Sequence, residues 1–292
     1  MVIMETGNNM KKLIFIPLTA ILLFVCQGFA EAQEADSVAF VNADWHWQDL
    51  GRKAETGYAQ IRLFDSMQSI SIVRFPARKY HTSILDAEGK EAAPTDSLAA
   101  CAGAQFAING SYFNTRTLEH ATFFSLNGEV LGETADEELF RCNGLLAIKR
   151  RNGRRMDILS YDPQRTEEYR TRYHAVLASG PVLLKDSREG DFDLGESFNS
   201  ARHPRSFVGL TPDGYIYLVV IDGRFPGKAD GASIPELAKI AGWLGLSDAL
   251  NLDGGGSSAI WANGAGIINH PCDNRRFDHN GARKVPNIIV IR

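Results

Sequence analysis

Several features that define large classes of protein are missing from this sequence. Its 292 residues carry a formal net charge of −4, so it lacks the positive charge with which nucleic-acid binders neutralise phosphates. Its glycines follow no fixed period, which excludes collagen-like and solenoid architectures. The motifs HExxH, GxSxG and CxxC are absent, which removes the main support for zinc peptidases, serine hydrolases and thioredoxin-like proteins. What remains is an ordinary globular composition, 44% hydrophobic.

The sequence also lacks an apolar run long enough to span a bilayer. The longest such run, 13–25, follows the basic pair Lys11 and Lys12, whereas a spanning helix needs about 20 apolar residues. Basic residues, a short apolar run and then small residues are typical of a secretory signal peptide. We therefore predict that residues 1–30 are a signal peptide and that the mature chain has no transmembrane segment.

The site of processing has two interpretations. Small residues place the cleavage of a signal peptide after Ala30 or Ala32. The alternative is lipoprotein processing at Cys26, although the bulky Val25 stands where a small residue is usual. Both interpretations predict an exported protein, periplasmic or extracellular, and the second adds a lipid tether through Cys26.

Cysteine is scarce, with four in the whole chain. Three of them, Cys101, Cys142 and Cys272, follow the predicted signal peptide. In an oxidising compartment we expect one disulfide among these three and one free thiol, and the sequence does not choose among the three pairings. Cysteine and histidine do not cluster at zinc-ligand spacing, so we expect no structural zinc site.

No linker rich in proline or serine interrupts residues 31–292, so we expect a single domain. Short apolar segments separated by turn residues predict many strands and few helices. The expected strands are 60–64, 69–75, 105–108, 123–126, 130–131, 145–149, 156–159, 175–177, 182–184, 206–210, 215–221, 249–252, 259–261 and 285–291. This pattern predicts an α+β fold with a large, mainly antiparallel or mixed β-sheet and a few flanking helices.

Turn residues predict three hairpins within this pattern. Asn127-Gly128 and Asn152-Gly153 each favour a tight primed turn between two strands. The segment 211–214 joins the third pair, because Pro212 presets one turn angle and Gly214 accepts another. The strand 217–221 is continuously apolar, which predicts burial on both faces.

Helical signals are fewer. Ser233 and Glu236 form a capping-box pattern, and apolar residues then follow at helical spacing up to Leu244, with Gly245 able to close the helix. A second, short helix is expected at 97–103.

Two carboxylates stand at the ends of apolar strands. Asp222 and Asp253 each precede a glycine, so each is projected from a rigid strand into a position that a ligand can approach closely. Paired carboxylates are what the cleavage of a glycosidic bond requires. The simpler interpretation is that an aspartate before a glycine is a turn residue.

The run 254–258, Gly-Gly-Gly-Ser-Ser, follows the second of these carboxylates. Consecutive backbone N–H groups and hydroxyls predict a nest for phosphate or sugar oxygens. It is not a Walker motif, because no lysine follows, and its spacing differs from a dinucleotide fingerprint. A flexible loop is the alternative.

Arginines provide candidate anion ligands in this acidic protein. Arg202 and Arg205 flank His203, and Arg224 follows Asp222-Gly223. Arginine binds phosphate in a bidentate manner and stays protonated. His203 is a candidate general acid or base. The alternative is that one arginine pairs with a nearby carboxylate while His203 only packs.

A third segment, Asn109-Gly110-Ser111, offers an amide and a hydroxyl next to aromatic residues, which suits a sugar, or else forms a plain turn. The other histidines have no ligand spacing, and we interpret them as surface or satisfied side chains. They are His46, His81, His120, His174, His270 and His279.

Taken together, these motifs resemble the phosphodiester glycosidase family, over roughly residues 105–291. The segments that carry the resemblance are Asn109–Phe113, Ser179-Gly180-Pro181, Arg202–Ser206, Val220–Arg224, Ser233 to Ala238, Ala249–Ser258 and Val285-Pro286-Asn287. The resemblance implies hydrolysis of a sugar-1-phosphodiester that releases the sugar, with α-N-acetylglucosamine as a candidate, and leaves the phosphate on its other partner.

The predicted site follows from these motifs. Asp222 and Asp253 act on the sugar carbon or on water, and Arg205, with Arg202 or Arg224, holds the phosphate. The predicted catalytic residues are Asp222, Asp253 and Arg205, and the predicted substrate-binding residues are Asn109, Gly110, Ser111, Arg202, His203, Ser206, Arg224, Gly254, Gly255, Gly256 and Ser257.

We expect no cofactor and no nucleic-acid partner. Two other functions remain open on these residues. One is a non-catalytic envelope protein that binds glycan or phosphate. The other is a metal-assisted phosphodiesterase in which Asp222 and Asp253 hold a divalent cation.

Overall fold

The computed structural model describes residues 35–87, 89–150 and 155–292. Contacts divide the chain into two compact units, Met1–Val38 and Ala39–Arg292, and all the strands named below belong to the second. The predicted signal peptide with Cys26 and the predicted turn Asn152-Gly153 lie outside the described residues.

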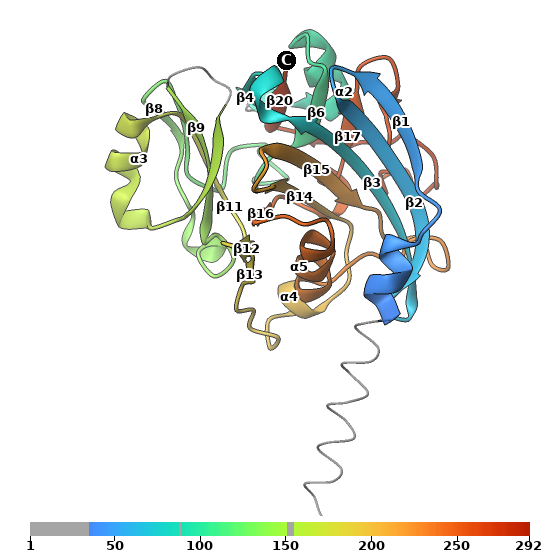
Figure 1. The fold of residues 1–292 in the computed structure, drawn as a ribbon. Coiled ribbons are helices and arrows are strands. Elements are labelled where there is room, and N and C mark those ends of the chain that lie inside the picture. Colours follow the sequence, from blue (N-terminus) through green and yellow to red (C-terminus); the bar gives the residue numbers. More distant parts are fainter. Residues whose placement is uncertain (1–34, 88, 151–154) are drawn as a thin grey trace, which may run out of the picture. The chain divides into compact units, whose positions relative to one another are not determined.

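The largest sheet of the second unit has eight strands (Figure 1). Every pairing in it is antiparallel. Its spatial order is β1 (His46–Gly51), β2 (Ala54–Leu63), β3 (Ser66–Pro76), β15 (Tyr215–Ile221), β14 (Arg205–Leu210), β16 (Asp248–Asn251), β12 (Val182–Lys185) and β13 (Arg188–Glu189).

Two smaller sheets and a ribbon complete the strands. One five-stranded sheet has the order β10 (Met156–Ser160), β9 (Gly144–Lys149), β11 (Tyr173–Ser179), β7 (Phe124–Leu126) and β8 (Glu129–Gly132). The other has the order β18 (Gly266–Ile267), β17 (Ile260–Ala262), β6 (Phe106–Asn109), β20 (Asn287–Ile291) and β4 (Thr82–Asp86), and β19 (Lys284–Val285) pairs with β5 (Ala93–Pro94). The α+β class and the mainly antiparallel pairing are confirmed, although three sheets share the strands expected in one.

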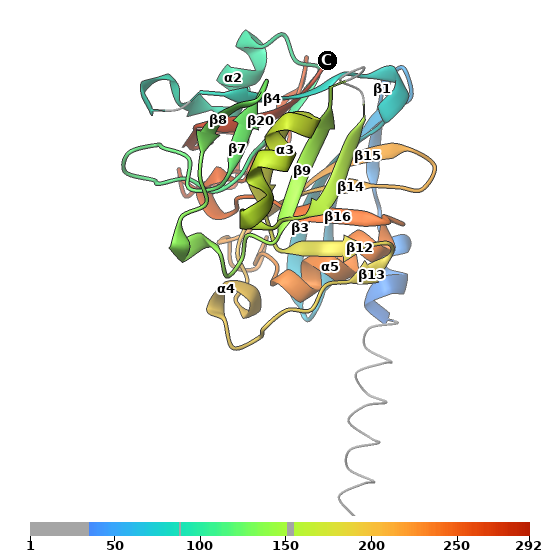
Figure 2. The same ribbon diagram turned by 90° about the vertical axis from the view of Figure 1, so that its left-hand side faces the viewer.

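The two faces of the eight-stranded sheet carry different cores. One face packs with both five-stranded sheets into a cluster that includes Leu218 and Val220 of β15. The other packs against α5 (Ile234–Trp243), as Figure 2 shows, in a cluster that includes Val219 and Ile221. Successive strand residues point to opposite faces, so β15 is buried on both sides, as its continuous apolar sequence predicts.

The predicted hairpins and the main helix are confirmed. The pairs β7–β8, β9–β10 and β14–β15 are antiparallel neighbours. Asn127 and Gly128 both have positive φ, as a primed turn requires. Ser233 and Glu236 form both hydrogen bonds of the capping box at the start of α5.

The other helices that the structure describes are short. Residues 35–41 are helical, and further along the chain lie α2 (Thr95–Cys101), α3 (Thr166–Arg172) and α4 (Ser197–Ser200), with the 3₁₀ turns η1 (Ala77–Lys79), η2 (Gly89–Glu91), η3 (Asp136–Glu138), η4 (Pro163–Arg165) and η5 (Gly255–Ser257). The helix expected at 97–103 therefore begins and ends two residues earlier. In the described ranges, no helix is long and apolar enough to cross a membrane.

The expected disulfide is wrong. Cys101, Cys142 and Cys272 are all free thiols. Cys142 packs in the apolar cluster of the β9–β11 sheet, whereas Cys272 packs with Phe225 in a separate cluster and Cys101 is exposed at the end of α2. The three thiols thus lie on different elements. A disulfide requires two cysteines to be close, so an oxidising compartment alone does not pair them.

Candidate active site

The sheet brings both predicted carboxylates to the same end of two strands. β14 pairs antiparallel with β15 on one side and with β16 on the other, so β15 and β16 run in the same direction. Asp222 follows the last residue of β15, and Asp253 lies two residues beyond the end of β16. Arg205, the first residue of β14, lies between these two strand ends, opposite Ile221.

The backbone of Asp253 is fixed by the strand end that carries Asn109. The Asp253 N–H donates to the Gly110 carbonyl at 2.9 Å, and the Asn109 side-chain amide donates to the Asp253 carbonyl at 2.6 Å. The Asp253 carboxylate accepts the Gly254 N–H at 2.9 Å. Asp253 is therefore presented at the end of β16 in one defined position.

The environment of Asp253 changes its acidity. Burial raises the pKa of the Asp253 carboxyl to about 6, and the Ser257 side chain, the positive charges of Arg141 and Arg283, and the Gly254 N–H act in the opposite direction. A carboxyl group with such a pKa exchanges protons close to neutral pH, which is the property of a general acid or base.

Positive charge surrounds Asp253. Arg205, Arg141 and Arg283 each interact electrostatically with the carboxylate. Arg224 lies against the glycine run, where a Cβ on Gly255 would come within 3.0 Å of its guanidinium. Several fixed guanidinium groups around one carboxylate suit an anionic substrate.

Two of these arginines were missed by the sequence reasoning. Arg283 precedes the Val285-Pro286-Asn287 motif, which is a signal that could have found it. Arg141 lies in the loop after η3, where Glu138 holds it in a bidentate pair and its guanidinium lies 4.0 Å from the ring centroid of Tyr112. Nothing in the local sequence indicates the position of Arg141.

Arg205 is more deeply built into the protein than a surface phosphate ligand would be. Its Nε donates to the Ala232 carbonyl at 3.0 Å, and its Nη2 donates to the carbonyls of Phe198 and Ala201 at 2.6 and 3.1 Å. Burial lowers its pKa to about 10. Arg205 therefore holds two loops together beside the site and supplies positive charge to it.

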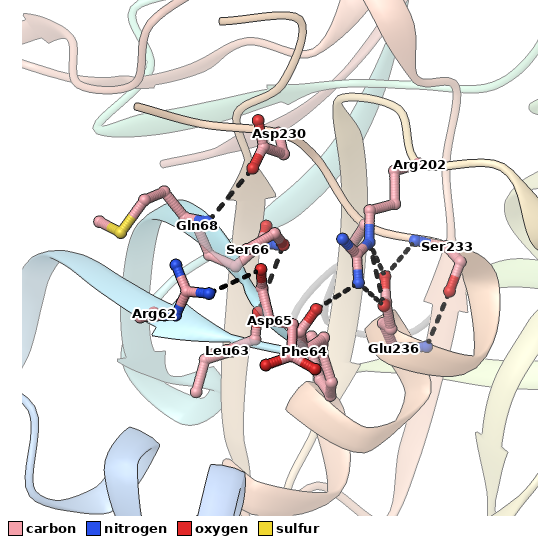
Figure 3. A network of polar contacts seen from close by, with 12 residues as sticks. Arg62, Leu63, Phe64, Asp65, Ser66, Gln68, Arg202, Asp230, Ser233 and Glu236 are labelled. Atoms are coloured by element: carbon pink, nitrogen blue, oxygen red, sulfur yellow. Dashed lines mark hydrogen bonds and ion pairs between the residues drawn. The ribbon is translucent and has the colours of Figure 1, made fainter. Parts of the chain in front are cut away.

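Arg202 is engaged at the N-terminus of α5, and its role as a phosphate ligand stays a prediction. Its guanidinium pairs with Glu236, at 2.5 Å from Nη2 to Oε1, and donates to the Phe64 carbonyl at 2.6 Å (Figure 3). Glu236 also accepts the Ser233 N–H of the capping box. Arg202 therefore fastens the N-terminus of α5, which is the simpler interpretation given above for one of the arginines.

Several backbone donors of the glycine run bind within the protein. The Gly254 N–H donates to Asp253, the Gly255 N–H donates to the Pro204 carbonyl at 2.8 Å, and the Ser257 N–H donates to the Gly254 carbonyl at 3.2 Å. The role of the run in binding an oxyanion stays a prediction.

The glycines are needed because other groups approach the backbone closely. A Cβ on Gly254 would lie 2.6 Å from the Pro204 carbonyl oxygen. A Cβ on Gly256 would lie 2.0 Å from an Asp273 carboxylate oxygen and 2.4 Å from Nη2 of Arg283. The run therefore allows Arg283, which pairs with Asp273, to lie against the turn that follows Asp253.

Asn109 and Ser206 support the site from beneath. Asn109 is fully buried, and its Oδ1 accepts the Ser206 hydroxyl at 2.8 Å and the Ala259 N–H at 3.2 Å. Because its amide also binds the Asp253 carbonyl, both ends of the Asn109 side chain are engaged. Asn109 therefore fixes the backbone of Asp253, and the role of both residues as substrate ligands stays a prediction.

Gly110 and Ser111 are used in the same way. A Cβ on Gly110 would lie 1.8 Å from Oδ1 of Asn287. That oxygen accepts the Ser111 N–H at 2.7 Å, and the Ser111 hydroxyl donates to the Ala178 carbonyl at 2.5 Å. Both residues thus contact neighbouring strands, and their role in substrate binding stays a prediction.

His203 lies between the two strand ends with its side chain half-buried. Burial and the positive charges of Arg205 and Arg224 lower its pKa. Its backbone pairs with Ala232 in an isolated bridge. The lowered pKa favours the neutral form of His203, and its role as a general acid or base stays a prediction.

Asp222 differs from Asp253 in its burial and in its hydrogen-bond partners. It is 1% exposed, and its carboxylate accepts hydrogen bonds from the Ser69 hydroxyl at 2.7 Å and the Asn269 amide at 2.9 Å. The backbone N–H and Nδ1 of His270 lie 2.9 and 3.0 Å from its oxygens. These four contacts hold the Asp222 carboxylate in place, and two of them orient His270, a histidine that the sequence reasoning left aside.

Among the described residues, no three His, Cys, Asp or Glu side chains are arranged to hold a metal ion.

The sequence matches the phosphodiester glycosidase family over residues 102–292. This chain belongs to the phosphodiester glycosidase family. The resemblance found in its motifs over 105–291 is thereby confirmed. No curated protein matches the sequence significantly.

Several solved structures have a fold similar to that of this chain. One is the zebrafish N-acetylglucosamine-1-phosphodiester α-N-acetylglucosaminidase catalytic domain, auto-inhibited by its pro-peptide, which is 18% identical with a TM-score of 0.65 over 90% of this chain and 92% of that chain. A hypothetical protein from Synechocystis is 16% identical with a TM-score of 0.59, over 85% and 63%. A protein described as exported, from Burkholderia pseudomallei, is 16% identical with a TM-score of 0.62, over 78% and 74%.

Proposed function

We propose that this protein is an exported hydrolase that cleaves a sugar-1-phosphodiester at its glycosidic bond. The products are the free sugar and a phosphomonoester. The observation that carries the proposal is Asp253, a carboxyl group with a pKa of about 6 that is surrounded by arginines. A proton-exchanging carboxylate next to fixed positive charge matches a reaction in which water attacks a sugar while an anionic phosphate leaves.

The arginines act on the phosphate. Arg283 and Arg224 border the glycine turn after Asp253, and their guanidinium groups bind the phosphate oxygens of the diester. Charge accumulates on the phosphate as it leaves the sugar, so these cations stabilise the transition state more than the ground state. Arg205, held by its three carbonyl partners, adds a fixed positive charge.

Asp253 acts on the water. Its carboxylate takes a proton from a water molecule whose oxygen forms a bond to the anomeric carbon. The bond between this carbon and the phosphate oxygen breaks, and its electron pair stays on the phosphate. Asp222 takes no part in this step, because its four hydrogen-bond partners occupy it and it serves to orient His270.

α-N-acetylglucosamine is the first sugar to test, because the zebrafish relative is named for it. The assay incubates the processed protein with an alkyl diester of α-N-acetylglucosamine 1-phosphate and measures free sugar. We expect free sugar to accumulate and a chelator to leave the rate unchanged. Loss of activity in chelator with recovery in added metal would favour the metal-assisted phosphodiesterase instead. Saturable binding of the diester without product would favour the non-catalytic binding protein.

A further inference from the structure

A pocket of about 400 Å³ lies beside Asp222. One wall is the β1–β2 ribbon, where His46 pairs opposite Tyr58 and Gln48 pairs opposite Thr56. These four side chains share one face of the ribbon because residues in direct register point the same way and alternate residues repeat the direction. His270, on the segment after β18, lines the pocket as well.

His270 is held rigidly in this pocket. Its Nδ1 lies 3.0 Å from the buried Asp222 carboxylate, and its ring stacks on Phe277 at 3.8 Å with an angle of 4° between the planes. The ring of His279 lies 4.6 Å away, at the same pocket. Because Nδ1 is bound to Asp222, Nε2 is the ring nitrogen that remains for a ligand. Contacts with Asp222, Phe277 and His279 therefore fix the ring of His270.

The chemistry of the lining points to a neutral ligand rich in hydroxyl groups. No aspartate, glutamate, lysine or arginine is among the residues that line the pocket. Imidazole, amide, phenol and hydroxyl groups each donate or accept hydrogen bonds, as sugar hydroxyls require. The volume lies within the range of about 300–1,000 Å³ that small-molecule sites occupy. The arginines that suit a phosphate lie instead around Asp253.

The pocket is joined to the catalytic centre through one short segment. Cys272, two residues after His270, lies 3.7 Å from Nη1 of Arg224, and Arg224 lies against the turn after Asp253. This segment connects the pocket to the turn that follows Asp253.

We propose that the pocket formed by Gln48, Thr56, Tyr58, His270 and His279 is a subsite for a neutral sugar ring of the substrate, adjacent to the ring whose phosphodiester bond is cleaved. The role of this subsite depends on the proposed function, whereas its binding of a sugar does not. His270 provides its most rigid hydrogen-bonding group, oriented by Asp222.

The test measures binding directly, in the processed protein. The protein carries Asp253→Asn, so that no substrate is hydrolysed during the titration. The probes are N-acetylglucosamine and its β-1,4-linked disaccharide, titrated by ligand-observed NMR up to about 20 mM. We expect saturable binding of at least one probe. His270→Gln and Gln48→Ala should each weaken it about tenfold, because each removes a hydrogen bond to the sugar.

Matched controls separate binding from folding. His174→Gln and Gln60→Ala change the same residue types outside the pocket and should leave the affinity unchanged. Thermal unfolding shows whether each variant is folded. If His270→Gln is unfolded, Gln48→Ala tests the subsite instead. Absence of saturable binding, or equal affinity in pocket and control variants, would overturn the subsite. Failure of the diester assay together with sugar binding that depends on the pocket would instead refute the proposed hydrolysis alone.

Discussion

At the scale of single residues, the two aspartates at the strand ends have opposite environments. Asp222 is enclosed by four hydrogen-bond donors, whereas Asp253 accepts the Gly254 N–H and has a pKa raised by burial. In the proposed mechanism Asp253 takes part in the chemistry, and Asp222 fixes the position of His270.

Replacing Asp253 with asparagine tests this assignment. Asparagine keeps an oxygen that can accept the Gly254 N–H but cannot take a proton from water. We expect kcat to fall by about 10²–10⁴, the usual contribution of a general base, while thermal unfolding stays cooperative. Turnover at the wild-type rate in a folded Asp253→Asn protein would remove Asp253 from the mechanism.

The raised pKa of Asp253 also predicts opposite pH dependences for activity and stability. As a base, Asp253 must be ionised, so kcat/KM should rise with pH through about 6 and then level off. Because the folded-state pKa lies above the unfolded value of about 3.9, the folded state retains the proton longer. This contribution to stability is present below about pH 4 and is lost as pH rises to about 6.

Pairs of pH profiles for the wild type and Asp253→Asn measure both effects. The rising limb of kcat/KM should be missing from the residual activity of the variant. Between about pH 4 and 6, the variant should become more stable relative to the wild type. A difference in stability that does not change with pH would show that the pKa of Asp253 is not raised.

Two arginines provide a matched test of the phosphate site. Arg283 and Arg202 each pair with one carboxylate, and their side chains are 33% and 34% exposed. Only Arg283 lies against the turn after Asp253. We expect Arg283→Ala to lower kcat/KM about 10–100-fold through loss of a charge-assisted hydrogen bond, and Arg202→Ala to leave it within about twofold. Equal losses in the two variants would contradict the placement of the phosphate.

At the scale of elements, sequence patterns predicted the turns and the helix cap that depend on neighbouring residues. The turn Asn127-Gly128 and the capping box of α5 depend on neighbours in sequence, and both form as expected. Ser206 and Asn109 are 97 residues apart, and Asn109 is 144 residues from Asp253, so no local signal showed that they meet. Their polar groups were assigned to a substrate because their partners within the protein were not visible in the sequence.

The capping box makes a prediction about stability alone. Ser233→Ala removes the hydroxyl that accepts the Glu236 N–H at the start of α5. We expect the free energy of unfolding to fall by about 1 kcal/mol, the usual cost of losing such a cap, with kcat/KM unchanged. Denaturant unfolding measures the first quantity. Ser200→Ala, at an exposed hydroxyl outside this helix, serves as the control and should change stability little.

At the scale of the whole molecule, the α+β class followed from composition and turn spacing, whereas the division of the strands among three sheets did not. β6 and β20 pair although more than half of the chain separates them, and such pairings depend on burial that only the folded chain creates. In the eight-stranded sheet, the pairing of β14 with β15 and β16 brings the two strand ends of the site together.

The central claim is that the bond cleaved is the one between the sugar and the phosphate. Hydrolysis of an alkyl diester of α-N-acetylglucosamine 1-phosphate in ¹⁸O-labelled water tests it most directly, with mass spectrometry of both products. The account predicts that the label enters the released sugar and that the phosphomonoester carries none. Label in the phosphate would contradict it, because water would then have attacked phosphorus and the protein would be a phosphodiesterase.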